Sequence, residues 1–257
     1  MLKTRVMPCM LFNGLHLIKT IQFDQIRNLG NPVQMARVYN SRNVDELIFI
    51  DMKATEEDRP PAYEIIKDII AECFMPLTVG GGIHSIEVIH RLLKIGADKV
   101  CINSEAINNP AFVTAAAKKF GSQCIVISID VKQVRKDHYV FKSRGRENTN
   151  ITVIEWVKQV EKLGAGEIFL TSIDKDGTMD GYDLDLIKKV SSTVSVPVIA
   201  CGGAGKVQDI IDAVKLGGAD AISLASIFHY GGHTPNSIKQ RMYNAGIPVR
   251  FIDKNQI

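Results

Sequence analysis

The stretch Pro76-Leu77-Thr78-Val79-Gly80-Gly81-Gly82 decides the fold, because the chain nearly repeats it as Pro197-Val198-Ile199-Ala200-Cys201-Gly202-Gly203. Each copy is a short apolar run that ends in glycines and leads into a helical pattern. The last glycines of the two copies are 121 residues apart (203 − 82 = 121), and Glu46 and Glu167 share that offset (167 − 46 = 121). A constant offset in a chain of 257 residues indicates that its two halves are structural copies.

Short apolar runs alternate with longer amphipathic runs along the whole chain. The apolar runs are rich in valine and isoleucine, as expected of parallel strands that are covered by helices. The predicted strands are residues 5–11, 46–51, 77–80, 99–102, 125–130, 167–172, 198–200 and 221–224. The predicted helices include residues 62–74, 86–95, 110–119, 153–163, 184–192 and 206–216. Eight alternations of strand and helix in about 250 residues predict a TIM barrel, the (β/α)₈ form of an α/β fold.

No segment rich in proline, serine or glycine separates the two halves, so we expect a single domain over residues 1–257. Its half-barrels span approximately residues 1–121 and 122–257. The alternation breaks once, because residues 131–141 and then 142–150 resemble a hairpin-like insert after Asp130. The insert contains the basic cluster Lys142-Ser143-Arg144-Gly145-Arg146, which fits either a solvated hairpin tip or a contact with a substrate phosphate or a partner.

The bulk composition limits the classes of function. With 46% hydrophobic and 23% charged residues, the chain can bury a substantial core. A net charge of +3 is too small to indicate nucleic acid or a membrane surface as a partner. No apolar run approaches the ~18 residues of a membrane span, and the N-terminus lacks the apolar core of a signal peptide. The five cysteines show no metal-ligand spacing. We therefore expect a soluble, cytoplasmic protein with no metal and no cofactor.

Two glycine turns predict sites for anions. In a barrel of this kind, residues that follow strands meet at one rim, where chemistry usually takes place. Gly82 and Gly203 each lie between a predicted strand and a helical pattern, where backbone N–H groups and the helix dipole favour an anion. The residues after the fourth and eighth strands complete the two cradles: Asn103, Ser104, Ala225 and Ser226. One such turn is equally compatible with a simple tight turn, but two copies predict an elongated ligand with a phosphate at each end.

Four charged residues lie at the starts of the first, second, fourth and sixth strands: Arg5, Glu46, Lys99 and Glu167. Strand starts meet at the rim opposite the anion sites, so these two cations and two anions predict a closed ring of salt bridges. Such a ring fits an ordinary ion-pair network that seals the base of the barrel.

Two carboxylates at the ends of strands are candidates for proton transfer. Asp130 ends the fifth strand among apolar residues, where its surroundings tune its pKa. The alternative is an aspartate that caps the following loop. Asp176 follows the sixth strand and is the weaker candidate, with loop ordering as its alternative. Lys19 lies in the first rim loop and is a candidate for binding substrate.

Over essentially its full length, the chain resembles the cyclase subunit of imidazole glycerol phosphate synthase. The segments that support the resemblance are Thr78-Val79-Gly80-Gly81-Gly82-Ile83, Gly96-Ala97-Asp98-Lys99-Val100, Leu170-Thr171-Ser172-Ile173-Asp174-Lys175-Asp176-Gly177-Thr178 and Ala200-Cys201-Gly202-Gly203-Ala204-Gly205-Lys206. In that family the barrel receives ammonia from a separate glutaminase subunit. The ammonia then attacks a bisphosphorylated ribulosyl aminoimidazole carboxamide at the far rim.

The resemblance assigns roles to individual residues. It implies that Gly82, Asn103 and Ser104 hold one phosphate, and that Gly177, Gly203, Ala225 and Ser226 hold the other. Thr171 and Lys19 complete the implied substrate-binding set. The four ring positions match the family's ammonia gate one for one, and Asp98 belongs to the surface on which the glutaminase docks in a heterodimer.

One position departs from the family pattern. The second aspartate of the family's acid–base pair falls at the end of the first strand, where this chain has Leu11. Because leucine cannot exchange a proton, the departure favours a branch with altered chemistry. In that branch, a glutaminase-like subunit and a separate amidotransferase convert an acetamido sugar of surface polysaccharide into an acetamidino sugar. The alternatives are a working cyclase of histidine biosynthesis, and a non-catalytic subunit that conducts ammonia or acts as a scaffold.

Overall fold

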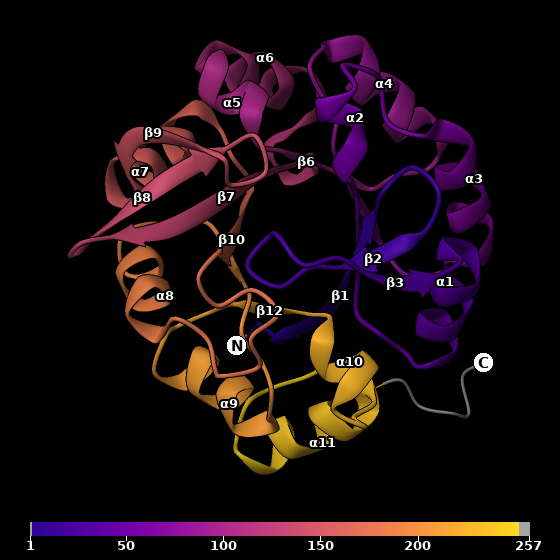
Figure 1. Ribbon diagram of the computed structural model, residues 1–257, viewed down its shortest axis with the longest axis vertical. Helices are drawn as coiled ribbons and strands as arrows, with labels where there is room; N and C mark the ends of the chain where they lie inside the picture. The colour runs from indigo at the N-terminus through magenta and orange to yellow at the C-terminus, as the bar shows by residue number, and fades with distance from the viewer. Residues whose placement is uncertain (1, 252–257) are drawn as a thin grey trace.

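The computed structural model describes residues 2–251, and in it eight parallel strands close into a ring that helices surround (Figure 1). In their order around the ring, the strands are β1 (Arg5–Phe12), β4 (Leu47–Asp51), β5 (Leu77–Gly80), β6 (Lys99–Ile102), β7 (Ile125–Val134), β10 (Glu167–Ser172), β11 (Val198–Cys201) and β12 (Ala221–Leu224). All neighbouring pairs are parallel, including β7 with β10 and β12 with β1, so the ring is closed. This confirms the predicted TIM barrel.

All eight predicted strands are present, and their bounds differ little from the prediction. The largest difference is at β7, which continues from the predicted end at Asp130 to Val134 because it runs on into the insert. Gly82 and Gly203 follow β5 and β11, the third and seventh strands of the ring. The two glycine turns therefore lie four strands apart around the barrel.

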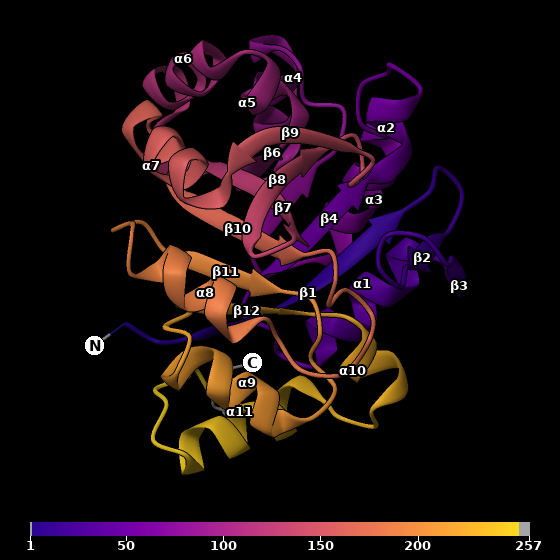
Figure 2. The ribbon, with the colours of Figure 1, turned by 60° about the vertical axis from the view of Figure 1, so that its left-hand side comes forward.

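Helices form the outer layer of the barrel (Figure 2). They are α1 (Pro32–Ser41), α2 (Met52–Glu56), α3 (Tyr63–Glu72), α4 (Ile86–Ile95), α5 (Ser104–Asn108), α6 (Pro110–Phe120), α7 (Val153–Leu163), α8 (Leu184–Ser191), α9 (Val207–Lys215), α10 (Ser226–Tyr230) and α11 (Pro235–Asn244), with a 3₁₀ turn at Ser122–Cys124. Local signals set their ends: α4 begins where the Ser85 hydroxyl accepts from the Val88 N–H and ends at Gly96, with φ of 113°. None of the helices within residues 2–251 has the length and apolar character that crossing a membrane requires.

The predicted hairpin-like insert is present between β7 and α7. The extended β7 pairs antiparallel with β8 (Asp137–Lys142), and β8 pairs antiparallel with β9 (Glu147–Thr152). The β8–β9 turn has positive φ at Ser143, Arg144 and Gly145. This turn is the tip of the insert, and it contains the basic cluster.

A second hairpin, after β1, was not predicted. It consists of β2 (Leu17–Lys19) and β3 (Arg27–Gly30), which pair antiparallel. β2 is only three residues long, and β3 is largely exposed with the sequence RNLG. Neither run shows the alternation of apolar and polar residues that indicates a strand.

The interior of the barrel contains one layer of apolar side chains from alternate strand positions. The layer consists of Met7, Cys9, Ile48, Cys101, Val126, Phe169, Ile199 and Ala221. Side chains on a strand alternate between its two faces. On β1, therefore, Arg5, Met7, Cys9 and Leu11 all point inward. The six residue steps from Arg5 to Leu11 correspond to about 20 Å along the strand, enough to reach from one rim to the other.

A buried ion pair ties the last helix to the second barrel strand. The Lys239 side chain of α11 is 1% exposed, and its Nζ lies 2.7 Å from Asp45 Oδ1. Asp45 Oδ2 accepts from the Val6 N–H at 2.8 Å. The pair therefore links α11, β4 and β1.

Lys239→Met is expected to lower the free energy of unfolding by about 3 kcal/mol, because it leaves the Asp45 carboxylate buried without its cation. Urea unfolding measures the loss. Adding Asp45→Asn removes the unpaired charge and keeps an acceptor for the Val6 N–H, so the double variant should recover part of the stability. Equal stability of Lys239→Met and the wild type would contradict this role.

Candidate active site

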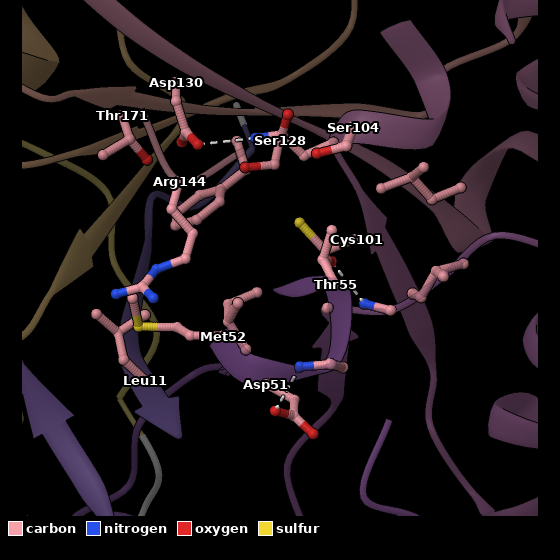
Figure 3. Close-up of a pocket in the computed structure, with 18 of the residues that line it drawn as sticks. Leu11, Asp51, Met52, Thr55, Cys101, Ser104, Ser128, Asp130, Arg144 and Thr171 are labelled. Atoms are coloured by element: carbon pink, nitrogen blue, oxygen red, sulfur yellow. Dashed lines mark hydrogen bonds between the residues drawn. The ribbon is translucent and has the colours of Figure 1, made fainter. Parts of the chain in front are cut away.

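A cavity of about 320 Å³ opens at the carboxyl ends of the strands. Its lining includes nine of the residues discussed above: Leu11, Lys19, Gly82, Asn103, Ser104, Asp130, Thr171, Asp176 and Ala225. Figure 3 shows Asp130, Thr171, Ser104 and Leu11 around the opening. The structure thus brings together one cradle, both candidate carboxylates and the substituted position.

Asp130 is the carboxylate whose environment suits proton transfer. Its side chain is buried, and its Oδ2 accepts from Asn103 Nδ2 at 2.8 Å. The pKa of Asp130 is raised to about 7, chiefly by burial and also by the negative charge of Asp176, while the Asn103 hydrogen bond acts in the opposite direction. Both protonation states are therefore accessible near neutral pH, as a general acid or base requires.

Asp176 is already engaged by its neighbours. Its Oδ1 lies 2.7 Å from Lys19 Nζ, and its Oδ2 accepts from the Thr20 hydroxyl at 2.7 Å. The Asp176 carbonyl also accepts from the Gln22 N–H at 2.8 Å. These contacts join the loop after β10 to the hairpin after β1. They favour loop ordering, the alternative role of Asp176, and they leave the phosphate contact of Lys19 a prediction.

Leu11 gives its side of the cavity an apolar surface. It packs against the interior layer together with Ile50 and Cys201. The nearby Asp51 does not replace the missing aspartate: its Oδ1 accepts from two backbone N–H groups of α2, and its Oδ2 lies 2.7 Å from Arg59 Nη1. Asp51 therefore orders the loop after β4.

All three residues of the first predicted cradle line the cavity. Gly82 has φ of 65°, and a Cβ at this position would lie 2.5 Å from the Arg59 carbonyl oxygen, so a larger residue does not fit. The Gly82 N–H donates to Thr55 Oγ1 at 3.1 Å. With Asn103 and Ser104 in the same cavity lining, the three residues form one polar corner.

The second predicted cradle is arranged differently. Of its members, Ala225 lines the cavity, whereas Gly177, Gly203 and Ser226 do not. Gly177 approaches the loop after β2, because an added Cβ would lie 2.3 Å from the Thr20 carbonyl oxygen. Gly203 approaches Gly181 in the same way, at 2.2 Å. Of the second set, only Ala225 lines the same cavity as the first set, and the phosphate contacts of the second set stay a prediction.

The predicted ring is present at the opposite rim. Arg5 Nη1 lies 2.7 Å from Glu46 Oε1 and 2.9 Å from Glu167 Oε1. Lys99 Nζ lies 2.8 Å from Glu46 Oε2 and 2.9 Å from Glu167 Oε1. The four side chains are only 11–21% exposed. Two cations and two anions thus alternate in a closed circuit across the base of the barrel.

Asp98 lies at the same rim and is exposed. Its Oδ2 accepts from the Leu77 N–H at 2.8 Å, and Asp220 accepts from the Val198 N–H at 2.9 Å in the second half of the chain. Both aspartates therefore cap the start of a neighbouring strand. The docking role of Asp98 stays a prediction.

Some cavity-lining residues were not indicated by the sequence pattern. Thr55 and Arg59 come from the segment after β4. The one sequence feature that could have indicated them is their position shortly after a strand that ends at Asp51. Arg144 lines the cavity from the tip of the insert, whereas Arg146 of the same basic cluster is exposed and does not line it.

Thiols line the cavity, but the described side chains do not form a group that could hold a metal ion. All five cysteines are free, and Cys9, Cys101 and Cys201 line the cavity. Burial raises the pKa of each of these three thiols. Among the described residues, no group of three or more His, Cys, Asp or Glu side chains is placed to hold a metal ion.

A family model described as "Histidine biosynthesis protein" matches residues 5–234. The match spans the barrel from the first residue of β1 to the residue before α11, and so includes both rims. Because it covers most of the 257 residues, the chain belongs to the histidine biosynthesis protein family.

Proposed function

We propose that this protein is the barrel subunit of a glutamine amidotransferase complex. It receives ammonia at the base of the barrel and supports its incorporation into a phosphorylated small molecule at the opposite rim. The ammonia comes from a glutaminase subunit docked below the ring, and a separate amidotransferase completes the set of partners. The altered residue at position 11 favours a role in forming an acetamidino sugar of surface polysaccharide.

The observation that carries the proposal is the alignment of ring and cavity on the same strands. Successive side chains of a strand point to opposite faces, so every second residue of a barrel strand faces inward. β1 thus has Arg5 in the ring and Leu11 in the cavity, and β10 has Glu167 in the ring and Thr171 in the cavity. Between them lies the apolar interior layer, with the buried hydroxyl groups of Thr78 and Ser223 at inward-facing positions of β5 and β12. A neutral molecule such as ammonia crosses an apolar layer at far lower cost than an ion.

The chemistry at the rim supports a change of reaction. Asp130 supplies one proton-transfer group with both protonation states accessible, and Leu11 supplies none. Addition of ammonia to an activated carbon requires removal of a proton from nitrogen, which one carboxylate can perform. Ring closure with cleavage of the substrate requires a proton to be taken and another to be given.

The second candidate is a genuine imidazole glycerol phosphate synthase cyclase. The raised pKa of Asp130 favours it, because a group that titrates near pH 7 can act first as base and then as acid. Binding of substrate without turnover, even with the partners present, would instead indicate a conducting or scaffold subunit.

The ring is tested by Lys99→Met in the complex with the glutaminase. This change leaves Glu46 and Glu167 without one of their two cations and opens the circuit. We expect more than one glutamate to be released per product, because ammonia escapes, while turnover with added ammonium stays within about threefold of the wild type. Lys94→Met, on the exposed end of α4, is the control. If Lys99→Met releases as much glutamate per product as the wild type, the proposal that the ring is an ammonia gate is contradicted.

A further inference from the structure

The tip of the insert places a cation with unused donor capacity at the cavity. Arg144 lines the cavity, and Figure 3 shows its side chain among the other lining residues. Its Nη1 lies 2.9 Å from Glu56 Oε2, but its Nε is buried and has no hydrogen-bond partner among residues 2–251. A buried donor without a partner is costly, which points to an acceptor that completes the site.

Glu56 is the shared partner of three cationic side chains. Its carboxylate lies 2.8 Å from Lys53 Nζ, 2.9 Å from Arg144 Nη1 and 3.3 Å from Arg146 Nη1. Of these three cations, only Arg144 lines the cavity, so it is the one that a ligand in the cavity can reach.

Helix α2 supplies oxygen atoms to donors from two different parts of the cavity lining. Thr55 Oγ1 accepts from the Gly82 N–H at 3.1 Å, and the next residue, Glu56, accepts from Arg144. A hydroxyl and a carboxylate of the protein thus occupy donors that a phosphate would bind through its own oxygens.

The tip is held in place over the cavity. A Cβ at Gly145 would lie 3.0 Å from the side chains of both Phe23 and Ile173, so the turn packs closely against the loops after β2 and β10. Arg144 itself has φ of 60°, a conformation that non-glycine residues adopt only when the surroundings require it. A firmly seated turn fixes where the guanidinium group points.

We propose that Arg144 binds a phosphate of the small-molecule substrate in the cavity, and that Glu56 is an internal competitor for Arg144. The bound phosphate accepts hydrogen bonds from Arg144 and displaces the Glu56 carboxylate. The inference rests on the proposed function only in taking a phosphorylated small molecule as the ligand. The rival explanation is a purely structural clasp, in which the Arg144–Glu56 pair only holds the insert down.

The test is a titration with inorganic phosphate, in which calorimetry or ³¹P NMR measures the dissociation constant. Arg144→Gln should weaken phosphate binding about tenfold, because a charge-assisted hydrogen bond is lost. Glu56→Gln should tighten it several-fold, because the competing charge is removed. Arg146→Gln is the matched control: Arg146 shares the Glu56 partner but does not line the cavity, so binding should stay within about twofold of the wild type.

Opposite effects of Arg144→Gln and Glu56→Gln distinguish ligand binding from a clasp. Parallel weakening by the two variants, or wild-type binding by Arg144→Gln, would overturn the proposal. Thermal unfolding checks that Arg144→Gln folds, and Arg144→Lys, which keeps the charge but lacks Nε, should give intermediate affinity.

A variant of the cradle itself separates this inference from the proposed function. Loss of binding in Ser104→Ala together with normal binding in Arg144→Gln would keep the cradle and overturn the role of Arg144. Phosphate binding needs neither ammonia nor turnover. If the variants show the expected pattern of phosphate binding but the protein forms no aminated product, the proposed function is contradicted and the role of Arg144 is not.

Discussion

Leu11→Asp is expected to raise the rate of ammonium-dependent turnover of the bisphosphorylated histidine-pathway substrate by about 10²–10⁴. Leu11 lines the same cavity as Asp130, and the change restores a second group that exchanges protons. The measurement is product formation from purified protein, substrate and an ammonium salt. Leu11→Asn is the matched control, because it has nearly the same size and polarity as aspartate but cannot give or take a proton.

The outcomes of this experiment separate the candidate functions. Ready turnover by the wild type would support the genuine cyclase. Turnover that appears only in Leu11→Asp would support an altered reaction on a scaffold that is otherwise intact. An inactive Leu11→Asp that folds and binds phosphate would contradict the view that position 11 alone separates this chain from the cyclase.

Asp130→Asn is expected to lower turnover in the reconstituted pathway by about 10²–10⁴, because it removes the remaining positioned carboxylate. At a fixed concentration of free ammonia, the wild-type rate should rise with pH through about 7, where Asp130 loses its proton. Asp137→Asn, an exposed acid-to-amide change on β8, is the control and should have no effect. Wild-type activity in Asp130→Asn would exclude a chemical role and favour conduction or a scaffold.

The same variant has a predicted effect on stability. The pKa of Asp130 rises from 3.8 to about 7 on folding, so the folded state holds the proton between these values and the unfolded state does not. The wild type therefore loses stability as the pH rises through this window. Because asparagine cannot ionise, the free energy of unfolding of Asp130→Asn relative to the wild type should increase between pH 4 and pH 8, by on the order of 4 kcal/mol. Denaturant unfolding at the two pH values measures the difference.

The sequence predicts those parts of the structure that follow from strand position. The ring at the base was predictable because Arg5, Lys99 and Glu167 each begin a parallel strand, and strand starts of a barrel converge. Asp130 was predictable for the same reason at the other end. Both predictions need only the position of the strand and its order in the chain.

What the sequence did not predict depends on the paths of loops. Gly203 resembles Gly82 in its local sequence, but it packs against the segment around Gly181 and, unlike Gly82, does not line the cavity. Glu56 and Arg144 meet across 88 residues, through a short helix and a strained turn. No periodic pattern encodes such a contact, because it depends on where two irregular segments end in space.

The charged circuit at the base has a consequence for how the barrel came together. Only its two acidic members obey the 121-residue offset, and both cations, Arg5 and Lys99, come from the first half of the chain. Two identical copies of that half, joined face to face, would set four positive groups against two negative ones. In this chain, the balance of the circuit therefore depends on the difference between the two halves, and a symmetric pair of first halves would lack it.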